Sequence, residues 1–406
     1  MAVSAATAEP HDVTGDPARV RPRSRLVSVW LWSLVVLVVV MVGIGGATRL
    51  TGSGLSITEW KPVTGAVPPL SDGAWTAEFE KYRASSQYRN LNRGMDLPEF
   101  KTIYWWEWSH RQLGRLLGLV FAVPLIGFWA TGAIRTRLAF ALLGIGALGG
   151  LQATVGWIMV ASGLEPGMIA VAPLKLMLHL VLASAILALL VWVATGPKPP
   201  RHPGAAERNP EPMEGPRKES APRTVQAVGP GFSLREPRND RVDALRAAGE
   251  PRSTHLAAAI FLGLVLLQIA LGGLVAGSRA GWTYNTWPLM DGRLVPPVEA
   301  LTSVTPWFEN FVDNPALVQL NHRLTAYLLV AFALWQAWSL RRRLPGSPAS
   351  HRAAGLAGLT LAQMALGIAT LVLVVPLWAG LAHQLLAMAL LVAATVHLRR
   401  SRTAAA

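Results

Sequence analysis

Long apolar runs separated by polar segments dominate this chain of 406 residues. About 20 consecutive apolar residues are enough to cross a bilayer as a helix. Eight such runs lie at 27–48, 109–131, 138–161, 172–194, 255–277, 316–339, 353–376 and 377–397. Pro376-Leu377-Trp378 leaves only a very short connection between the last two. The pattern predicts an all-α membrane protein with eight transmembrane helices.

The chain also repeats itself. Gly45-Gly46 returns as Gly272-Gly273, and His110-Arg111 returns as His322-Arg323. Further along, Gln152 with Gly156 returns as Gln363 with Gly367, and His179 returns as His383. Each half contains four crossings, an even number, so both halves start from the same face of the membrane. We therefore expect two four-helix bundles, 27–194 and 255–397, related by a pseudo-two-fold axis along the membrane normal.

A segment of different composition joins the halves. Residues 195–254 contain 11 Pro and 6 Gly in a mixture of basic and acidic side chains. Such a stretch has too little apolar surface to offset the entropy of ordering it. It is predicted to be a disordered cytoplasmic linker, and 1–26 and 398–406 are predicted to be cytoplasmic tails.

The basic charge indicates topology. The chain has 37 Lys and Arg against 23 Asp and Glu, a net charge of +14. With the amino terminus inside, inner segments carry 24 Lys and Arg and outer segments carry 9. This bias predicts that both termini face the cytoplasm, or the matrix if the membrane belongs to an organelle. The topology explains the basic charge, so binding of nucleic acid need not be assumed. The first apolar run is longer than the core of a signal peptide and is therefore predicted to be a retained helix.

Four histidines stand out among nine. His110, His179, His322 and His383 each lie on one predicted membrane helix, at equivalent places in the two halves. Ionisable side chains inside a bilayer are costly and are usually functional. The other five (His11, His202, His255, His351 and His397) fall in tails, the linker or inner helix ends, where a solvated or interfacial role suffices.

The surroundings of these histidines favour a flat, bulky ligand. Gly114, Ala183, Ala326 and Ala387 each follow a histidine by four residues, on the same helix face. Small residues leave room for a macrocycle, although close helix packing explains them equally well. Paired histidines between facing helices are typical of heme ligation, and the chain has no Cys. Zinc or copper usually needs a third or fourth ligand.

Charged neighbours differ between the halves. Glu107 precedes His110 by three residues, whereas Gln319 stands at the equivalent place before His322. A carboxylate in only one of two equivalent pockets suggests chemistry in the first half; an interfacial glutamate is the alternative. Arg111 and Arg323 could pair with heme propionates, or extend to the membrane surface.

Together these residues identify a family resemblance. The chain resembles the heme A synthases through Glu107-x-x-His110-Arg111, the segment 46–55, Asn321-His322-Arg323, and the histidines 179 and 383. The resemblance covers nearly all of the membrane region. Because segment 49–108 lacks the cysteine pair of some members, the chain is similar to the cysteine-free proteobacterial and mitochondrial branch.

The resemblance implies an oxidoreductase of the bacterial cytoplasmic membrane. It implies that the C8 methyl of heme O becomes a formyl group by successive hydroxylations, giving heme A for terminal oxidases. His110 and His179 would hold the substrate heme, His322 and His383 a heme b, and Glu107 would be catalytic. An electron acceptor is required, and heme O synthase, oxidase assembly factors and a homo-oligomer are partners left open.

Two other functions fit the same histidines. A diheme electron-transfer protein similar to quinol oxidoreductases accounts for the four histidines but leaves the difference between Glu107 and Gln319 unexplained. A transport or heme-delivery protein is suggested by the parallel repeat alone.

Overall fold

The fold is a bundle of long helices. The computed structural model describes residues 24–196 and 252–402. Within these ranges eight helices are long and apolar enough to cross a membrane. They are α1 (Arg25–Leu50), α4 (Leu97–Ala130), α5 (Thr136–Gly163), α6 (Pro173–Ala194), α8 (Arg252–Gly277), α11 (Pro315–Arg343), α12 (Pro348–Val372) and α13 (Leu377–Arg402). The all-α prediction with eight crossings is confirmed.

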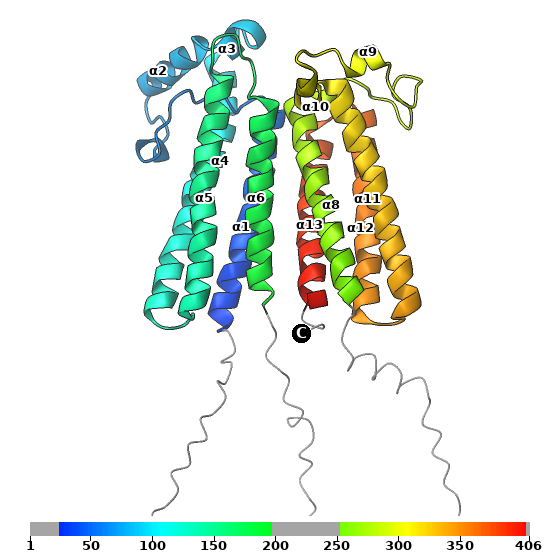
Figure 1. Cartoon of the computed structure of the whole chain (residues 1–406). Coiled ribbons are helices and arrows are strands. Elements are labelled where there is room, and N and C mark those ends of the chain that lie inside the picture. Colours follow the sequence, from blue (N-terminus) through cyan, green and yellow to red (C-terminus); the bar gives the residue numbers. More distant parts are fainter. Residues whose placement is uncertain (1–23, 197–251, 403–406) are drawn as a thin grey trace, which may run out of the picture.

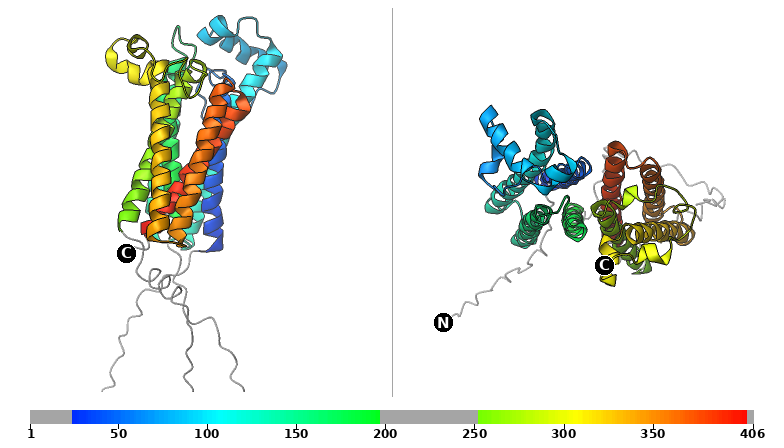
Figure 2. Two further views of the ribbon diagram at one scale, coloured as in Figure 1. Left: turned by 90° about the vertical axis from the view of Figure 1, so that its right-hand side faces the viewer. Right: turned by 90° about the horizontal axis from the view of Figure 1, so that it is seen from above.

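The helices stand in two groups of four (Figures 1 and 2). One group contains α1, α4, α5 and α6, and the other contains α8, α11, α12 and α13. The described chain enters and leaves both groups at the lower end in Figure 1, which we call the tail end. Of the predicted tails and linker, residues 1–23, 197–251 and 403–406 lie outside the described residues. The predicted tail was placed too early at the carboxyl end, because helix α13 continues through 398–402, and 252–254 already belong to α8.

Short helices cover the opposite end, which we call the cap end. The first half carries α2 (Asp72–Arg83) and α3 (Ser86–Leu91), and the second carries α9 (Val298–Leu301) and α10 (Asn310–Asp313). In the first cap, Lys81 donates to Glu59 at 2.8 Å and to Glu78 at 2.8 Å. The second cap is held by amides, since Asn314 donates to the Asn310 side chain at 2.8 Å.

One predicted helix start was wrong by twelve residues. The apolar run 109–131 belongs to α4, which begins at Leu97. Asp96 accepts from the Glu99 backbone N–H while the Glu99 side chain accepts from the Asp96 N–H, a capping box that starts a helix. The helix therefore begins before the membrane-compatible part of its sequence, and Trp105, Trp106 and Glu107 lie inside it.

The short connection before the last helix is a tight turn. Helix α12 ends at Val372 and α13 begins at Leu377. Val374 and Val375 take left-handed backbone conformations, with φ of 62° and 56°. The two predicted spans are thus separate helices.

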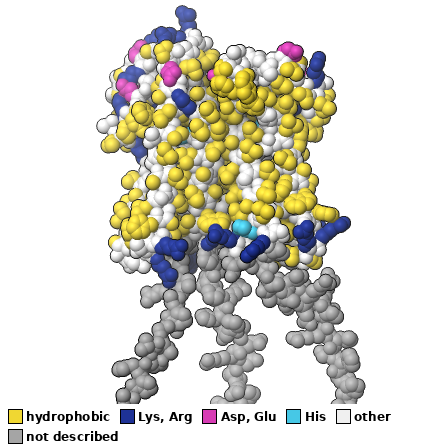
Figure 3. Space-filling model, in the orientation of Figure 1, with side chains coloured by type: hydrophobic (Ala, Val, Ile, Leu, Met, Phe, Trp, Pro, Cys, Tyr) yellow, Lys and Arg dark blue, Asp and Glu magenta, His cyan; other side chains and the backbone are white. Residues whose placement is uncertain are grey.

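The face of the bundle seen in Figure 3 is apolar along its middle. Lys and Arg side chains lie at both ends of this band, and Asp and Glu at the cap end. Large side chains such as Leu119 and Ile126 are more than half exposed. An apolar surface of this extent is unfavourable in water but compatible with the hydrocarbon core of a bilayer.

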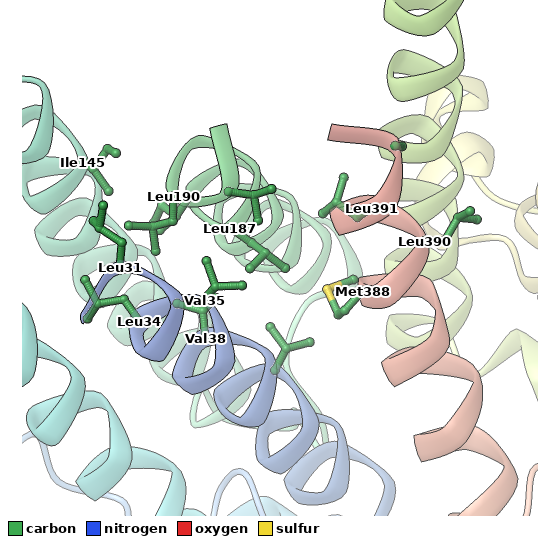
Figure 4. Packing of buried hydrophobic residues seen from close by; sticks show 14 of the residues in the cluster. Leu31, Leu34, Val35, Val38, Ile145, Leu187, Leu190, Met388, Leu390 and Leu391 are labelled. Atoms are coloured by element: carbon green, nitrogen blue, oxygen red, sulfur yellow. The ribbon is translucent and has the colours of Figure 1, made fainter. Parts of the chain in front are cut away.

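The interior joins the two halves. Leucines and valines of α1 and α6 interdigitate beside Met388 and Leu391 of α13 (Figure 4). Between the halves, a Cβ on Gly277 would lie 2.6 Å from the Pro173 Cα, so α6 and α8 approach at backbone distance. Arg49 donates to the carbonyl of Ala276 at 2.7 Å. The halves are packed directly on one another.

Candidate functional site

Each half brings its two membrane histidines together. His110 and His179 lie on α4 and α6, and His322 and His383 lie on α11 and α13. His110 is within electrostatic range of His179, and His322 of His383. All four side chains stay partly accessible although they lie among helices. The pairing within each half is the one expected from the repeat.

A glycine on the preceding membrane helix faces every one of these imidazoles. A Cβ built on the glycine would lie 2.8 Å from Cε1 in three cases and 3.2 Å in the fourth. The pairs are Gly45 with His110, Gly156 with His179, Gly272 with His322, and Gly367 with His383. Real Cβ contacts at 2.8 Å essentially do not occur, so three of the rings occupy space that only glycine leaves open, and the fourth contact, at 3.2 Å, would be tight. We call this contact the glycine seat.

Three of the four rings are also covered by a glutamine. Its Nε2 donates to the backbone carbonyl of the histidine at 3.0 or 3.1 Å. It lies 3.1 to 3.4 Å from both ring nitrogens. An atom in the ring plane and equally far from both nitrogens would collide with Cε1, so the amide lies over the ring face. The glutamines are Gln152, Gln268 and Gln363, each four residues before its glycine.

Comparing the two halves of the sequence with each other identified only part of this arrangement. It aligned Gln152 with Gln363 but missed Gln268, which lies four residues before Gly272. The fourth equivalent position, before Gly45, is Met41. The missing signal was the constant spacing of four residues between these positions and the glycine seats.

The histidines fit heme iron. Because each amide lies over a ring face, the in-plane lone pair of a ring nitrogen remains available to a metal. His110 Nδ1 is buried and has no hydrogen-bond partner. Beyond His110 on α4, a Cβ on Gly118 would meet nothing within 4 Å. In the described part of the chain, no three His, Cys, Asp or Glu side chains gather in one place.

Glu107 is a buried carboxylate that pairs with Arg111 on its own helix and accepts hydrogen bonds from the first loop at the cap end. Its side chain is almost fully buried, with 3% exposed. One carboxylate oxygen accepts from the Ser56 hydroxyl at 2.8 Å and from the Ile57 N–H at 2.7 Å. The other accepts from Arg111, which also donates to the carbonyls of Ile57 and Glu59. We call Glu107 and Arg111 the first latch, because they tie the loop to α4.

A second latch occupies the equivalent place in the other half. Gln319 accepts from Arg323 at 3.0 Å and donates to the carbonyls of Ala280 at 2.7 Å and Tyr284 at 3.3 Å. Arg323 donates to Tyr284 and to further loop carbonyls. Both expected propionate partners, Arg111 and Arg323, therefore hold outer loops.

A cavity of about 240 Å³ opens beside the first latch. It lies between the first outer loop and α5, and its wall includes Arg111, Trp60 and Trp157. The two indole rings lie 6.2 Å apart. The cavity thus borders the Arg111 side of the first latch.

His397 is a correction to the sequence analysis. A solvated or interfacial role was expected for it, but its side chain is 1% exposed. It lies 3.3 Å from Gln336 and 3.4 Å from Arg352. Its position near the end of a predicted span gave no sign that α11 and α12 would cover it.

The fold and the paired histidines define a class, that of multi-pass helical membrane proteins able to bind heme between helices. A family model described as "Cytochrome oxidase assembly protein" matches residues 28–228 and 231–395. The "Heme A synthase" of Methylobacterium sp. (strain 4-46) is 56% identical over 94% of this chain and 95% of that protein. The chain belongs to the heme A synthase family.

More distant relatives agree. Proteins named "Heme A synthase" from Beijerinckia indica subsp. indica and Azorhizobium caulinodans are 47% and 44% identical. The matches cover 93% and 95% of this chain, and 93% and 96% of those proteins. These relatives give no support to the alternative of a diheme electron-transfer protein.

Proposed function

We propose that this protein oxidises heme O to heme A, converting the C8 methyl of the porphyrin to a formyl group. The observation that supports this most strongly is a difference in charge between two equivalent sites. Both halves seat two histidines on glycines, but only the first has a buried carboxylate, Glu107, one turn from a histidine. The family named above supplies the reaction.

We assign the first half to the substrate and the second half to a resident heme b. His110 and His179 would be the axial ligands of heme O, and His322 and His383 those of heme b. When bound, heme b supplies a one-electron relay. The conversion adds oxygen from water and removes electrons and protons, so an electron acceptor, as yet unidentified, must receive them.

Glu107 would accept a proton or stabilise positive charge developing at the methyl carbon. Ser56, the Ile57 N–H and Arg111 hold the carboxylate in one orientation. A charge that is already oriented needs no reorganisation when charge develops nearby, and this makes it effective in a dry site. The first latch thus has the properties of a preorganised electrostatic group.

Arg111 and Arg323 are proposed as partners of the heme propionates. Arg111 lines the cavity at the cap end. Arg323 Nε is buried without a partner and retains a donor that its loop contacts do not use. Guanidinium donors match carboxylates in charge and geometry.

The protein is a multi-pass membrane protein, and we propose that both termini face the cytoplasm. The excess of Lys and Arg in the segments at the tail end supports this orientation. The cap end, with the latches and the cavity, would then face the outer side. Heme O synthase and oxidase assembly factors are the expected cellular partners.

The proposal is tested with Glu107→Gln and the matched control Ser56→Ala. E107Q removes the charge, and S56A keeps the charge while removing one of its donors. Loss of one preorganised electrostatic group typically lowers the rate by about 10²–10³. We expect purified E107Q to contain heme b and heme O with little heme A, measured by extraction and chromatography.

Two outcomes would contradict the catalytic role. Normal heme A in E107Q would leave Glu107 with a structural role only. Equal loss of heme A in S56A and E107Q would show that the integrity of the first latch matters, and not the charge. Wild-type protein with heme b as its only pigment would contradict the proposed function itself.

A further inference from the structure

The four histidines that we assign to heme are not held alike. Over three rings lies a glutamine amide that is anchored to the histidine's own backbone carbonyl. Over His110, the equivalent position of α1 is Met41. This difference falls on one ligand of the half to which we assign the substrate.

The glutamines fix the orientation of their imidazoles. Each Nε2 points to the histidine carbonyl, because a carbonyl oxygen accepts from an N–H and repels Oε1. The Oε1 of the same amide is buried and has no donor to accept from. The amide is therefore held in one orientation over the ring face, with the glycine seat against Cε1. A ring confined by both contacts keeps its nitrogen aimed in one direction. Groups that orient a metal ligand raise its affinity for the metal.

Met41 cannot provide this restraint. A thioether has no N–H to donate to the carbonyl of His110 and is only a weak acceptor. Its Cε lies 3.4 Å from the place where a Cβ on Gly114 would stand, one turn beyond His110. His110 Nδ1 has no partner. Of the four imidazoles, only that of His110 lacks the amide.

We propose that Met41 makes His110 the releasable axial ligand, while the three glutamines keep the other ligands bound. The inference rests on the proposed function. Substrate heme must enter and product heme must leave in every turnover, whereas heme b stays. Detachment of His110 would come first and leave the heme on His179 alone, and loss of that remaining bond would then complete the exchange. The step is a ligand exchange and needs no oxidant.

The test exchanges the two residue types. Met41→Gln adds an amide over His110, and Gln268→Met removes the amide over His322. Met41→Leu is the matched control, because leucine is apolar and also lacks an amide. Purified wild-type and variant proteins, with their hemes bound, are mixed with excess apomyoglobin, and the rate of heme transfer is measured. The heme that remains is identified by chromatography, so heme O or A reports the first half and heme b the second.

We expect slower release in M41Q and faster release in Q268M. Changing a residue that orients a metal ligand typically alters affinity by about 10–100-fold. Release of heme O or A should fall by a factor of this size in M41Q and stay unchanged in M41L. Release of heme b should rise by a similar factor in Q268M.

Failure of this inference is distinguishable from failure of the proposed function. Equal release from M41Q, M41L and wild type, with heme O or A present, would overturn the inference alone. Unchanged release of heme b from Q268M would overturn it by a second route, even if M41Q did not fold. If the wild-type protein held no heme O or A, the proposed function would fall and this inference with it.

Discussion

The first and second latches occupy the same place but differ in polarity. In the first half the loop offers donors, the Ser56 hydroxyl and the Ile57 N–H, and a carboxylate accepts from both. In the second half the loop offers the carbonyls of Ala280 and Tyr284, and an amide donates to both. Each arginine, four residues further on, pairs with its Glu or Gln.

The comparison shows that the difference between Glu107 and Gln319 combines a difference in charge with a difference in hydrogen-bond donation. Glu and Gln differ in charge, and this alone suggested catalysis in the first half. They also differ in hydrogen bonding, because Gln donates and an ionised Glu only accepts. The first loop presents donors and requires an acceptor, whereas the second presents carbonyls and requires a donor. The new amide in Glu107→Gln would place an N–H against either Arg111 or the loop donors. The structural part of the difference must therefore be measured before the remainder is attributed to chemistry.

The largest effect is expected from filling a glycine seat. Gly45→Ala would place a methyl 2.8 Å from His110 Cε1, and Gly272→Ala would place one 3.2 Å from His322 Cε1. Overpacking of this kind typically costs about 1–3 kcal/mol, and here it also turns the ligand. We expect G45A to lose the first-half heme nearly completely and G272A to lose only part of the second-half heme. Heme content per protein is the measurement.

Gly263→Ala is the control for these variants. Gly263 lies on α8 with Gly272, and a Cβ there would meet nothing within 4 Å. Full heme content in G45A, or equal losses in G263A and G272A, would show that the seats do not position the histidines.

A smaller effect is expected from Gln319→Glu, the reverse of E107Q. The carboxylate would face the carbonyl oxygens of Ala280 and Tyr284 without a proton to donate. An unsatisfied buried polar group costs about 1–3 kcal/mol. We expect a lower unfolding midpoint for the solubilised protein, while pairing with Arg323 limits the loss. A midpoint equal to that of wild type would mean that the loop adapts and that latch polarity is not a constraint.

The smallest expected effect is a difference between the two caps in how their stability depends on pH. Hydrogen bonds from Lys61 and then Lys81 lower the pKa of Glu59 in the first cap. A lowered folded pKa gives stability that is present above the unfolded value, about 4.3, and is lost as the pH falls through the folded value. The side chains of Glu59, Lys61 and Lys81 are 36–47% exposed. Solvent therefore screens their charges, and only a small loss of stability is expected. The second cap is held by Asn310 and Asn314, which do not titrate there.

Backbone hydrogen exchange measures this difference. On acidification below about pH 4, protection should fall in α2 and stay constant around Asn310. Equal changes in the two caps would exclude the ionic contacts of Glu59 as the cause.

The membrane helices and the histidine pairs were predictable because they depend on local sequence. A run of about 20 apolar residues fixes a span, and the repeat marks His110 with His179 and His322 with His383. The start of α4 was also encoded locally, in the capping box of Asp96 and Glu99, but outside the apolar run.

The contacts that set chemistry were not predictable, because they join distant segments. Glu107 bonds to Ile57, fifty residues earlier, and the polarity of that loop is visible only when it is folded. The amide over His322 comes from Gln268 on α8. The buried state of His397 depends on Gln336 and Arg352 on two other helices. The four candidate histidines could be chosen from the sequence, whereas the side chains that restrain them became visible only in the fold.

The pairing of Glu107 with Arg111 also has a consequence for how the chain enters the bilayer. On the insertion scale, a single acidic or basic residue at the centre of a helix costs about 2.5–3.5 kcal/mol. The two side chains lie one turn apart and pair directly, so the ion pair that they form lies within α4 alone. Because both belong to one helix, this neutralisation is available before any later helix or any heme arrives.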